Sequence, residues 1–535
     1  MQVPSLTLDG VAFHLADGRC LFSDIHLHLD ATPTGLVGRD GVGKSVLARI
    51  LAGQLAPSRG RRSAQGRVHY LPQQVAVAAG ASVADLAGMG PVVAALARIE
   101  AGSADPADFE AVGERWDIRR ELATALRMQD LPEWEPGHPA ALLSGGEAMR
   151  VALAGAWLAG ADLLILDEPS NHLDRAQRER LRRRLADWPG GLLVVSHDRT
   201  LLEDMRQIVE LSPQGLRCHG GGYGAYAEAA ARASAAAQAE LDRQRAGLRR
   251  VERERQQAHQ RMQRRQARGR QEGHEANQAP ILLGLSKSRS EASQGRQQAL
   301  QDRALAQQRD AVREAASQVA PERPVVLWPP RPLQRRRTAV LQGARLPFGP
   351  HAAHPLDLVL EAGRRIAVCG GNGRGKSTLL RMLAGRLMPA EGTCEVPVAR
   401  AWLDQHLGGI DARLAPLSLL RDANPALPEA DLRLRLVLLG LAAEALERPC
   451  ASLSGGERLK VALACALYAA EPAELLLLDE PANHLDLPSR QALEAMLQDY
   501  PGTLVVVSHD EALLERLALD GRLDLDRERP RLEPW

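Results

Sequence analysis

Short apolar runs recur along the chain, and each ends abruptly in charged or polar residues. Residues 163–168 read LLILDE and residues 475–480 read LLLLDE, whereas LLVVSHD at 192–198 and LVVVSHD at 504–510 end in Ser-His-Asp. Continuous apolar runs of this length predict parallel strands that are buried on both faces of a sheet. Ligands bind at the carboxyl ends of such strands in open α/β sheets, so the polar ends of these runs are candidate site residues.

The middle of the chain has a different pattern. From about 226 to 320 it is rich in Ala, Gln, Arg and Glu and offers few apolar side chains for burial. This composition predicts two long helices that form a hairpin. The tip is expected near 271–290, where Gly273 and Pro280 interrupt the helical pattern, and the second helix over about 290–319.

Arginines are concentrated in the first of these two expected helices. They are Arg245, Arg249, Arg250, Arg253, Arg255, Arg261, Arg264, Arg265, Arg268 and Arg270. Only Glu252 and Glu254 oppose them within this stretch, and the tip, with Lys287 and Arg289, is modestly basic. Such a density of positive charge suits binding to phosphates, although exposed arginine-rich helices also serve as solvated spacers.

The two halves of the chain repeat the same motifs in the same order, which indicates a duplicated domain. The nonapeptide LDEPSNHLD at 166–174 returns as LDEPANHLD at 478–486, and GRDGVGKS at 38–45 returns as GGNGRGKS at 370–377. Both octapeptides fit the P-loop pattern G-x-x-x-x-G-K-S, and each stands between an apolar stretch and a helical pattern, as the motif requires. We therefore expect an α/β fold with two P-loop domains joined by a long helical-hairpin linker.

Each P-loop is expected to bind the phosphates of ATP. Its glycines let backbone N–H groups turn towards phosphate oxygens, and the following helix adds its partial positive charge. Lys44 and Lys376 are expected to reach the β- and γ-phosphates, and Ser45 and Ser377 to ligate Mg²⁺. The loop residues expected at the two nucleotides are Gly38, Gly41, Gly43, Lys44, Ser45, Gly370, Asn372, Gly373, Gly375, Lys376, Ser377 and Thr378.

The two carboxylates at the end of each LDE run are expected to have different roles, one in metal binding and the other in general-base catalysis. Asp167 and Asp479 would hold Mg²⁺ directly or through water. Glu168 and Glu480 stand one residue further on and point to the opposite side, where each can polarise an attacking water as the general base.

Three further features complete each expected site: the LSGGE segment, a histidine and a glutamine. LSGGE opens an amphipathic helix in both halves, and the N–H groups at such a start can bind phosphate. His197 and His509 recur at the same place after the carboxylates, and we interpret them as sensors of the γ-phosphate. Gln73 and Gln405 stand where a glutamine that contacts the metal and the water is expected. The LSGGE residues concerned are Ser144, Gly145, Gly146, Ser454, Gly455 and Gly456.

Composition adds mainly exclusions. The 535 residues are 45% hydrophobic and 25% charged, which suits a soluble globular protein. The net charge of +1 is by itself no argument for a nucleic-acid partner. The six cysteines include no C-x-x-C pair, which is typical of reduced thiols in the cytoplasm. The N-terminus does not resemble a signal peptide, and no apolar run is long enough to span a membrane, so we expect no membrane domain.

With the P-loop, the glutamine, LSGGE, the Asp-Glu pair and the switch histidine in this order in both halves, the chain resembles the ATP-binding cassette superfamily. The resemblance implies that two cassettes pair head to tail around two ATP molecules. Each P-loop would then face the LSGGE turn of the other half, and each site would take residues from both. The expected domains are a first cassette over 1–222, a basic helical linker over 223–335 and a second cassette over 336–535.

The residues that follow the Asp-Glu pair, P-[SA]-N-H-L-D, resemble those of the ABC-F subfamily, twin-cassette ATPases that act on ribosomes. The resemblance implies a monomer in which these residues lie where its two cassettes face each other. They are Asn171, His172, Asp174, Asn483, His484 and Asp486. It also implies the ribosome as partner, with the linker near ribosomal RNA or the tRNA in the peptidyl site. Regulation, rescue, biogenesis and antibiotic resistance stay open as roles, although the moderate length of the linker does not favour resistance.

Two features of the first half depart from the cassette pattern. Asp40 replaces the usual asparagine, which Asn372 supplies in the second loop, and its charge beside the phosphates predicts weaker binding of ATP at the first site. Phe348 is expected to stack on adenine in the second half, whereas the matching position in the first half is Leu15, with Phe13 as a less favoured alternative.

A third departure is the stretch 74–143, which is longer than its counterpart in the second half. It is either a ribosome-contacting insertion or a longer loop with a helix at 92–100.

Two other classes of cassette protein are disfavoured. Fused transporter ATPases typically lack both a basic helical hairpin and the NHLD sequence. DNA-repair or chromosome-organising ATPases would need zinc-binding cysteines or hundreds of coiled-coil residues between the halves. A ribosome-associated ATPase is therefore the favoured hypothesis, and the ATPase subunit of a transporter is the alternative.

Overall fold

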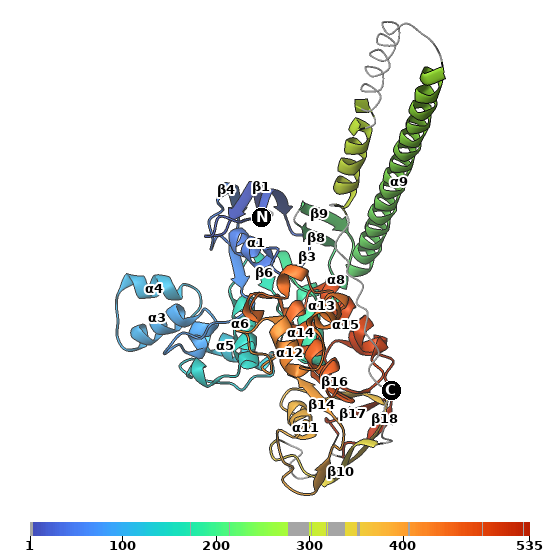
Figure 1. Ribbon diagram of the computed structural model, residues 1–535. Coiled ribbons are helices and arrows are strands. Elements are labelled where there is room, and N and C mark those ends of the chain that lie inside the picture. The colour runs from blue at the N-terminus through green and yellow to red at the C-terminus, as the bar shows by residue number, and fades with distance from the viewer. Residues whose placement is uncertain are drawn as a thin grey trace. The chain divides into compact units, whose positions relative to one another are not determined.

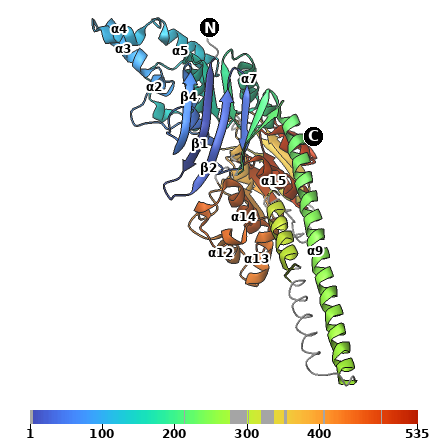
Figure 2. The same cartoon turned by 90° about the horizontal axis from the view of Figure 1, so that it is seen from above.

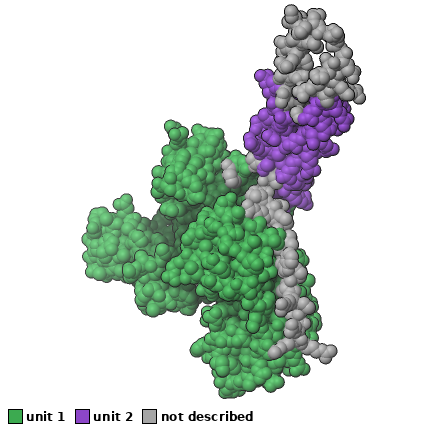
Figure 3. Space-filling model, in the orientation of Figure 1, with its two compact units in different colours: residues 1–225, 323–535 green, residues 226–322 purple. Residues whose placement is uncertain are grey.

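The computed structural model describes residues 4–535 except 172, 213, 276–298, 301, 317, 319–336, 350–353, 405–406, 484 and 528. The chain divides into two compact units, coloured green and purple in Figure 3. The larger unit, 1–225 with 323–535, holds both repeated halves of the sequence. The smaller unit, 226–322, holds the helical segment between them.

The first half contains a six-stranded sheet and a three-stranded antiparallel sheet. The large sheet has the strand order β5-β6-β7-β3-β8-β9 and is parallel apart from β9, and the small sheet has the order β2-β1-β4. The strands are β1 Ser5–His14, β2 Cys20–Leu29, β3 Thr34–Gly38, β4 Arg59–Gln65, β5 Val68–Leu71, β6 Leu163–Asp167, β7 Gly191–Val195, β8 Gln207–Ser212 and β9 Gly215–Gly220. The helices are α1 Lys44–Leu51, α2 Val83–Leu86, α3 Gly90–Glu100, α4 Pro106–Val112, α5 Ile118–Arg127, α6 Gly145–Leu158, α7 Arg175–Ala186 and α8 Arg199–Glu203.

The second half repeats this architecture strand for strand. Its large sheet has the order β14-β15-β16-β12-β17-β18, parallel apart from β18, and its small sheet has the order β11-β10-β13. The strands are β10 Arg337–Ala344, β11 Leu356–Glu361, β12 Arg365–Cys369, β13 Thr393–Glu395, β14 Arg400–Leu403, β15 Leu475–Asp479, β16 Thr503–Val507, β17 Gly521–Asp524 and β18 Leu532–Pro534. The helices are α11 Lys376–Leu383, α12 Pro416–Ala423, α13 Glu429–Leu438, α14 Gly455–Leu467, α15 Leu487–Asp499 and α16 Glu511–Arg516.

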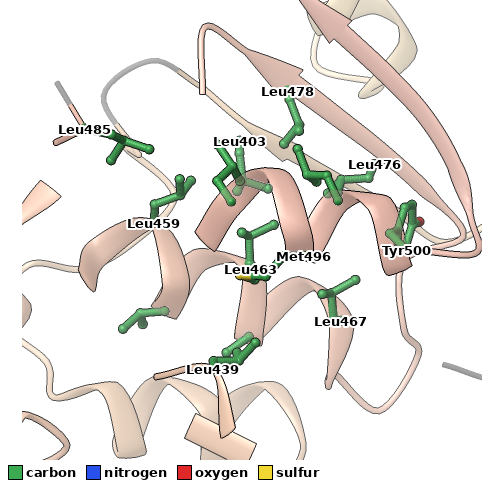
Figure 4. Packing of buried hydrophobic residues seen from close by; sticks show 14 of the residues in the cluster. Leu403, Leu439, Leu459, Leu463, Leu467, Leu476, Leu478, Leu485, Met496 and Tyr500 are labelled. Carbon is green, nitrogen blue, oxygen red and sulfur yellow. The ribbon is translucent and has the colours of Figure 1, made fainter. Parts of the chain in front are cut away.

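The predicted apolar runs form the central strands of the large sheets. Every residue of β6, β7, β15 and β16 is buried. In the second half, Leu459, Leu463 and Leu467 lie four residues apart on one face of α14, where they pack with Leu476 of β15 and Met496 of α15 (Figure 4). The expected α/β fold with two P-loop halves and a helical region between them is confirmed.

The smaller unit contains the long helix α9 (Tyr223–Glu275) from Tyr226 onwards and a second helical stretch at 299–300 and 302–316. Within this unit the two run side by side in both views (Figures 1 and 2). The side chain of Gln308 donates a hydrogen bond of 3.1 Å to the Gln244 carbonyl, and Arg255 pairs with Asp302 at 2.9 Å. Because residues later in α9 meet residues earlier in the second stretch, the pair is antiparallel, as a hairpin requires.

The expected break of the first linker helix at Gly273 is wrong. Helix α9 continues through Gly273 to Glu275. An isolated glycine costs only about 1 kcal/mol relative to alanine inside a helix, which good helix-forming neighbours can offset. Pro280 and the rest of the expected tip from 276 onwards lie outside the described residues, as do 290–298 of the second helix.

The long stretch 74–143 of the first half folds into helices α2 to α5. Val83, Ile118 and Leu122 are fully buried in a small core that these helices share. The expected helix at 92–100 lies within α3. The stretch is therefore a packed helical subdomain with more helices than the one expected at 92–100, and its contact with the ribosome stays a prediction. Among the described helices of the whole chain, none combines the length and the apolar character that a membrane span requires.

Candidate nucleotide sites at the two P-loops

The first P-loop connects β3 to α1. Gly43, which caps α1, has a left-handed backbone with φ of 106°, and a Cβ placed there would lie 2.6 Å from a methyl carbon of Leu21, so only glycine fits. The Lys44 ammonium group donates hydrogen bonds to the carbonyl oxygens of Gly38 at 2.8 Å and Arg39 at 3.1 Å. The loop therefore wraps around its own lysine, and the main chain turns at the start of α1, as a phosphate-binding loop requires.

The second P-loop, between β12 and α11, has the same geometry. Gly375 caps α11 with φ of 95°, and a Cβ there would lie 2.9 Å from Leu346. Lys376 donates to the carbonyl oxygens of Gly370 at 2.6 Å and Gly371 at 3.0 Å. The glycines that the motif places in these loops therefore meet a steric and conformational need in both halves.

The two aspartates at the strand ends lie beside the P-loop serines. Burial raises the pKa of Asp167, while hydrogen bonding to Ser45 opposes the increase, and Asp479 and Ser377 show the same opposition. The Oδ1 atom of Asp167 is buried and has no hydrogen-bond partner among the described residues. A hydroxyl and a carboxylate side by side are the hard oxygen donors that Mg²⁺ prefers, so these residues fit the ion.

The two glutamates share an unusual backbone conformation. Glu168 and Glu480 have φ of 50° and 52°, a left-handed conformation that non-glycine residues seldom adopt and that concentrates at functional sites. Their Oε1 atoms are buried without a hydrogen-bond partner in the described chain, and burial raises the pKa of Glu168 and brings that of Glu480 to about 7. The Nε2 atoms of His197 and His509 lie 3.7 and 3.6 Å from these Oε1 atoms. Each glutamate therefore lies next to the histidine of its own half, and the pair in the first half is buried.

Asp40 lies between two other groups of the first site. Its Oδ1 atom is 3.4 Å from Lys44 Nζ and 3.6 Å from His197 Nε2. Burial raises the pKa of Asp40, but hydrogen bonding to His197 and the charge of Lys44 together outweigh burial, so the pKa lies below its ordinary value. Asp40 is therefore charged at neutral pH and engages the two groups that are expected to contact the γ-phosphate.

The LSGGE turns are built as helix caps. The Ser144 hydroxyl accepts a hydrogen bond from the Glu147 amide at 3.3 Å, while the Glu147 carboxylate accepts from the Ser144 amide at 2.8 Å, which forms a capping box at the start of α6. Ser454 and Glu457 form the same box at the start of α14. The glutamate of LSGGE thus has a structural role that the sequence interpretation missed, although Ser-x-x-Glu before a helix is its signature.

The expected glutamines are unequally described. Gln73 lies two residues beyond the end of β5 and is half-buried, whereas Gln405 lies outside the described residues. A residue that the sequence interpretation missed lies nearby, because the Tyr70 hydroxyl donates a hydrogen bond of 3.2 Å to Asp167. The corresponding position in the second half is Trp402, which has no hydroxyl to offer.

The exposed aromatic residue of the second half lies beside its P-loop. Phe348 is 66% exposed in the bend after β10. A Cβ on the adjacent Gly349 would lie 3.6 Å from the carbonyl oxygen of Gly373. An exposed ring next to a phosphate loop is placed where an adenine could stack on it.

The first half offers no aromatic ring at the matching position. Gly10 and Gly343 share a left-handed φ of 57° and 55° in β1 and β10, and Leu15 and Phe348 each follow five residues later. Phe13 instead packs against the core of the first half. Leu15 is therefore the counterpart of Phe348, as expected.

The last aspartate of each nonapeptide reaches the P-loop of the other half. Asp486 accepts a hydrogen bond of 2.9 Å from the Asp40 amide, and Asp174 Oδ2 lies 3.5 Å from the Asn372 amide. We call the surface where these contacts occur the seam. Of the other nonapeptide residues expected there, Asn171 is buried, whereas His172 and His484 lie outside the described residues.

Several of the linker arginines already have acidic partners within the linker. Arg250 pairs with Glu254 at 2.9 Å, and Arg255 pairs with Asp302 of the second helical stretch at 2.9 Å. Among the residues whose side chains are described, Arg249, Arg261 and Arg264 form no ion pair. The charge available to a partner is therefore smaller than the sequence indicated. The side chains of Arg265, Arg268 and Arg270 are outside the described set.

The chain is similar to known proteins over both halves. The sequence profile of the ABC transporter family matches residues 23–171 and 353–483. The tylosin resistance ATP-binding protein TlrC of Streptomyces fradiae is 32% identical over 557 residues, which cover 96% of this chain and 95% of TlrC. The energy-dependent translational throttle protein EttA of Mycobacterium tuberculosis is 29% identical over 527 residues, which cover 90% of this chain and 84% of EttA.

A similar fold is found among solved structures. The archaeal ribosome recycling factor aABCE1, in complex with the ribosomal stalk protein aP1, superposes with a TM-score of 0.57 at 21% sequence identity. The match covers 96% of this chain and 87% of that one. At this identity the likeness concerns the fold alone.

Proposed function

The chain belongs to the ATP-binding cassette family as an ATPase of the ABC-F type, and on that premise we propose that it binds two ATP molecules at the seam and couples their hydrolysis to an action on the ribosome. We assign the first cassette to 1–222, the linker to 223–335 and the second cassette to 336–535. In support, α9 begins at Tyr223 and β10 at Arg337.

One observation carries the proposal of two composite sites. The aspartate that ends each nonapeptide contacts the P-loop of the opposite half, through Asp486 with the Asp40 amide and Asp174 near the Asn372 amide. The nonapeptide also contains the Asp-Glu pair of its own site. Each half therefore has the chemical groups of one proposed nucleotide site and contacts the P-loop of the other site.

In each site the residues divide the work as follows. The P-loop main chain, with Lys44 or Lys376, holds the phosphates, and the LSGGE turn of the other half presents its helix start to the γ-phosphate. Bound Mg²⁺, held by the P-loop serine and the strand-end aspartate, supplies charge neutralisation for the phosphates. The glutamate takes a proton from the attacking water as general base, and its histidine, within 4 Å, orients the γ-phosphate.

The base assignment is tested with the double variant Glu168→Gln, Glu480→Gln. Glutamine keeps the volume of glutamate but cannot take the proton, so hydrolysis should slow by on the order of 10² or more while ATP binding is retained. Hydrolysis is measured by phosphate release, and binding by calorimetry. Glu179→Gln, which alters an exposed carboxylate on α7, is the control and should keep the parental rate. A parental rate in the double variant would disprove the assignment.

The ribosome as partner is supported by the relatives and by the linker. EttA is named as a translational throttle, and the chain is similar to it over both cassettes. Arg249, Arg261 and Arg264 of the linker keep charge that no described carboxylate neutralises. Exposed arginines on a helix bind nucleic-acid phosphates and release counterions, so they can dock the linker on ribosomal RNA or on tRNA.

Co-sedimentation with ribosomes tests this partner. The Glu168→Gln, Glu480→Gln protein with ATP should pellet with ribosomes at low salt, and the log–log salt dependence should have a slope near −0.7 to −0.9 for each phosphate contacted. Adding Arg261→Glu and Arg264→Glu should abolish pelleting while ATPase activity without ribosomes is kept. The charge-matched control, Arg243→Glu with Arg250→Glu, alters arginines that already have acidic partners and should weaken binding less.

The outcome also separates the proposal from its alternative. A transporter ATPase would ignore ribosomes and pellet with membranes. If the trapped protein pellets with neither, the ribosomal part of the proposal fails and the twin-cassette ATPase remains.

The similarity to TlrC favours antibiotic resistance as a second candidate role, although the moderate length of the linker does not favour it. The test is the lowest concentration of tylosin that stops growth of a sensitive strain. Expression of the parental protein should raise it, and expression of the Glu168→Gln, Glu480→Gln variant should not. An unchanged value with the parental protein would exclude resistance to tylosin.

A further inference from the structure

An arginine follows each nonapeptide at the same distance. The proposed nucleotide sites assign it no role. Arg178 stands four residues after Asp174, and Arg490 four residues after Asp486. Both side chains are anchored in the same way, because the Nε of Arg178 donates to the Leu173 carbonyl at 3.0 Å and that of Arg490 to the Leu485 carbonyl at 3.1 Å. The two guanidinium groups are thus held in matching orientations at the starts of α7 and α15.

We call the loop that contains His197 or His509 the switch loop of its half. Arg178 reaches across the seam to the switch loop of the second half. Its Nη1 atom donates a hydrogen bond of 3.4 Å to the main-chain carbonyl oxygen of His509. The amide of the same residue, His509, donates to Glu480 Oε2 at 3.4 Å, and its ring Nε2 lies 3.6 Å from Glu480 Oε1. The residue that Arg178 holds is therefore the one that contacts the proposed base from two directions.

The surroundings of Arg178 favour a fixed guanidinium. Its side chain is only 16% exposed, and its Nη1 atom lies 3.7 Å from Asp198 in the switch loop of its own half. Arg490 makes the equivalent contact in the second half, at 3.1 Å to Asp510. Because a planar guanidinium with one edge already anchored loses little freedom on forming another hydrogen bond, Arg178 can fix the His509 main chain.

We propose that Arg178 is a positioning residue for hydrolysis at the second nucleotide site, where it acts across the seam by fixing the main chain of His509 against Glu480. The inference rests on the proposed function, because it takes Glu480 as a base. It means that hydrolysis at the second site depends on a residue of the first half and requires a closed seam. Arg178 would act through His509, whose main-chain carbonyl oxygen it contacts.

Site-resolved kinetics test the proposal. In a Glu168→Gln background, where the second site keeps its base, adding Arg178→Gln should lower kcat on the order of tenfold with KM within about twofold, since small misplacements of catalytic groups carry such costs. In a Glu480→Gln background the same change should alter kcat less than twofold. Arg178→Lys should restore part of the rate, because lysine can donate to the His509 carbonyl but cannot also keep the Leu173 contact. Arg182→Gln is the matched control on the same helix, since Arg182 pairs with Asp204 at 2.8 Å and should leave both backgrounds unchanged.

Amide hydrogen exchange supplies a readout that does not depend on catalysis. Arg178→Gln should increase deuterium uptake in the peptide 504–514, which contains His509, and leave the peptide 192–202 unchanged. An equal loss of kcat in both backgrounds, no loss in the Glu168→Gln background, or unchanged exchange in 504–514 would each overturn the proposal. Failure of the proposed function would look different, because the Glu168→Gln, Glu480→Gln protein would then hydrolyse ATP at the parental rate whatever the effect of Arg178.

Discussion

At the scale of single residues, the two nucleotide sites differ most at one position of the P-loop. Asp40 in the first loop and Asn372 in the second have the same place in the motif. The Asp40 carboxylate engages Lys44 and His197, so binding of a phosphate must compete with a fixed negative charge. The first site also has Leu15 where the second has Phe348, so it would lack the proposed stacking of adenine on a ring, worth roughly 0.5 to 1.5 kcal/mol.

Replacing the charge should therefore strengthen the first site. At a separation of roughly 6 Å and an effective dielectric constant of about 20 to 80, one unit charge acts on another by roughly 0.7 to 3 kcal/mol. Asp40→Asn should tighten binding of ATP at the first site by about threefold or more, measured by calorimetry in a Lys376→Ala background. The mirror-image change, Asn372→Asp in a Lys44→Ala background, should weaken the second site. Unchanged affinities in both variants would show that the asymmetry has another cause.

At the scale of elements, the LSGGE helices α6 and α14 present their starts to nucleotide only if those starts are ordered. The capping boxes of Ser144 with Glu147 and Ser454 with Glu457 provide this order without any ligand. Some of the amide groups in these turns already donate hydrogen bonds within the capping boxes, and the others would be available to a phosphate. Helix capping and the proposed nucleotide binding therefore involve the same short segments.

Removal of a cap should reduce the stability of the protein. Ser144→Ala should lower the free energy of unfolding by about 1 kcal/mol, as is usual for the loss of a serine cap. Chemical denaturation without nucleotide measures this loss. Ser144→Thr keeps a capping hydroxyl and should lose much less. Equal stability of the alanine and threonine variants would mean that the box contributes nothing to the helix start.

At the scale of the whole molecule, the two halves are also joined by ion pairs. Glu494 of α15 is buried and lies 3.0 Å from Arg199 of the first half and 2.6 Å from Arg516 of its own half. Arg175 and Glu511 also pair across the halves, at 2.7 Å, but both are exposed. One link between the halves is therefore shielded from water and the other is not.

These two links should respond differently to the removal of one partner. Glu494→Ala leaves the buried Arg199 without its carboxylate, and removing one partner of a buried ion pair typically costs about 3 to 5 kcal/mol. Glu511→Ala breaks an exposed pair, for which about 0 to 1 kcal/mol is usual. Urea denaturation followed by tryptophan fluorescence compares the two variants. A loss as small for Glu494→Ala as for Glu511→Ala would show that the buried pair does not hold the halves together.

The sequence by itself determined the repeated halves, the P-loops, the buried central strands and the helical linker. These features depend on local rules, because a strand buried on both faces needs an uninterrupted apolar run and a phosphate loop needs glycine at left-handed positions such as Gly43 and Gly375. The strand ends then fixed Asp167 and Glu168, with their counterparts, at one edge of each sheet.

Only the tertiary structure decided which of these groups meet. The engagement of Asp40 with His197, the pairing of Arg255 with Asp302 and the contact of Arg178 with the His509 carbonyl all join residues far apart in the chain. No local pattern encodes such contacts, because they depend on how whole strands and helices pack. A linker arginine and a seam arginine look alike in sequence, and they differ only in the partner that packing brings to each.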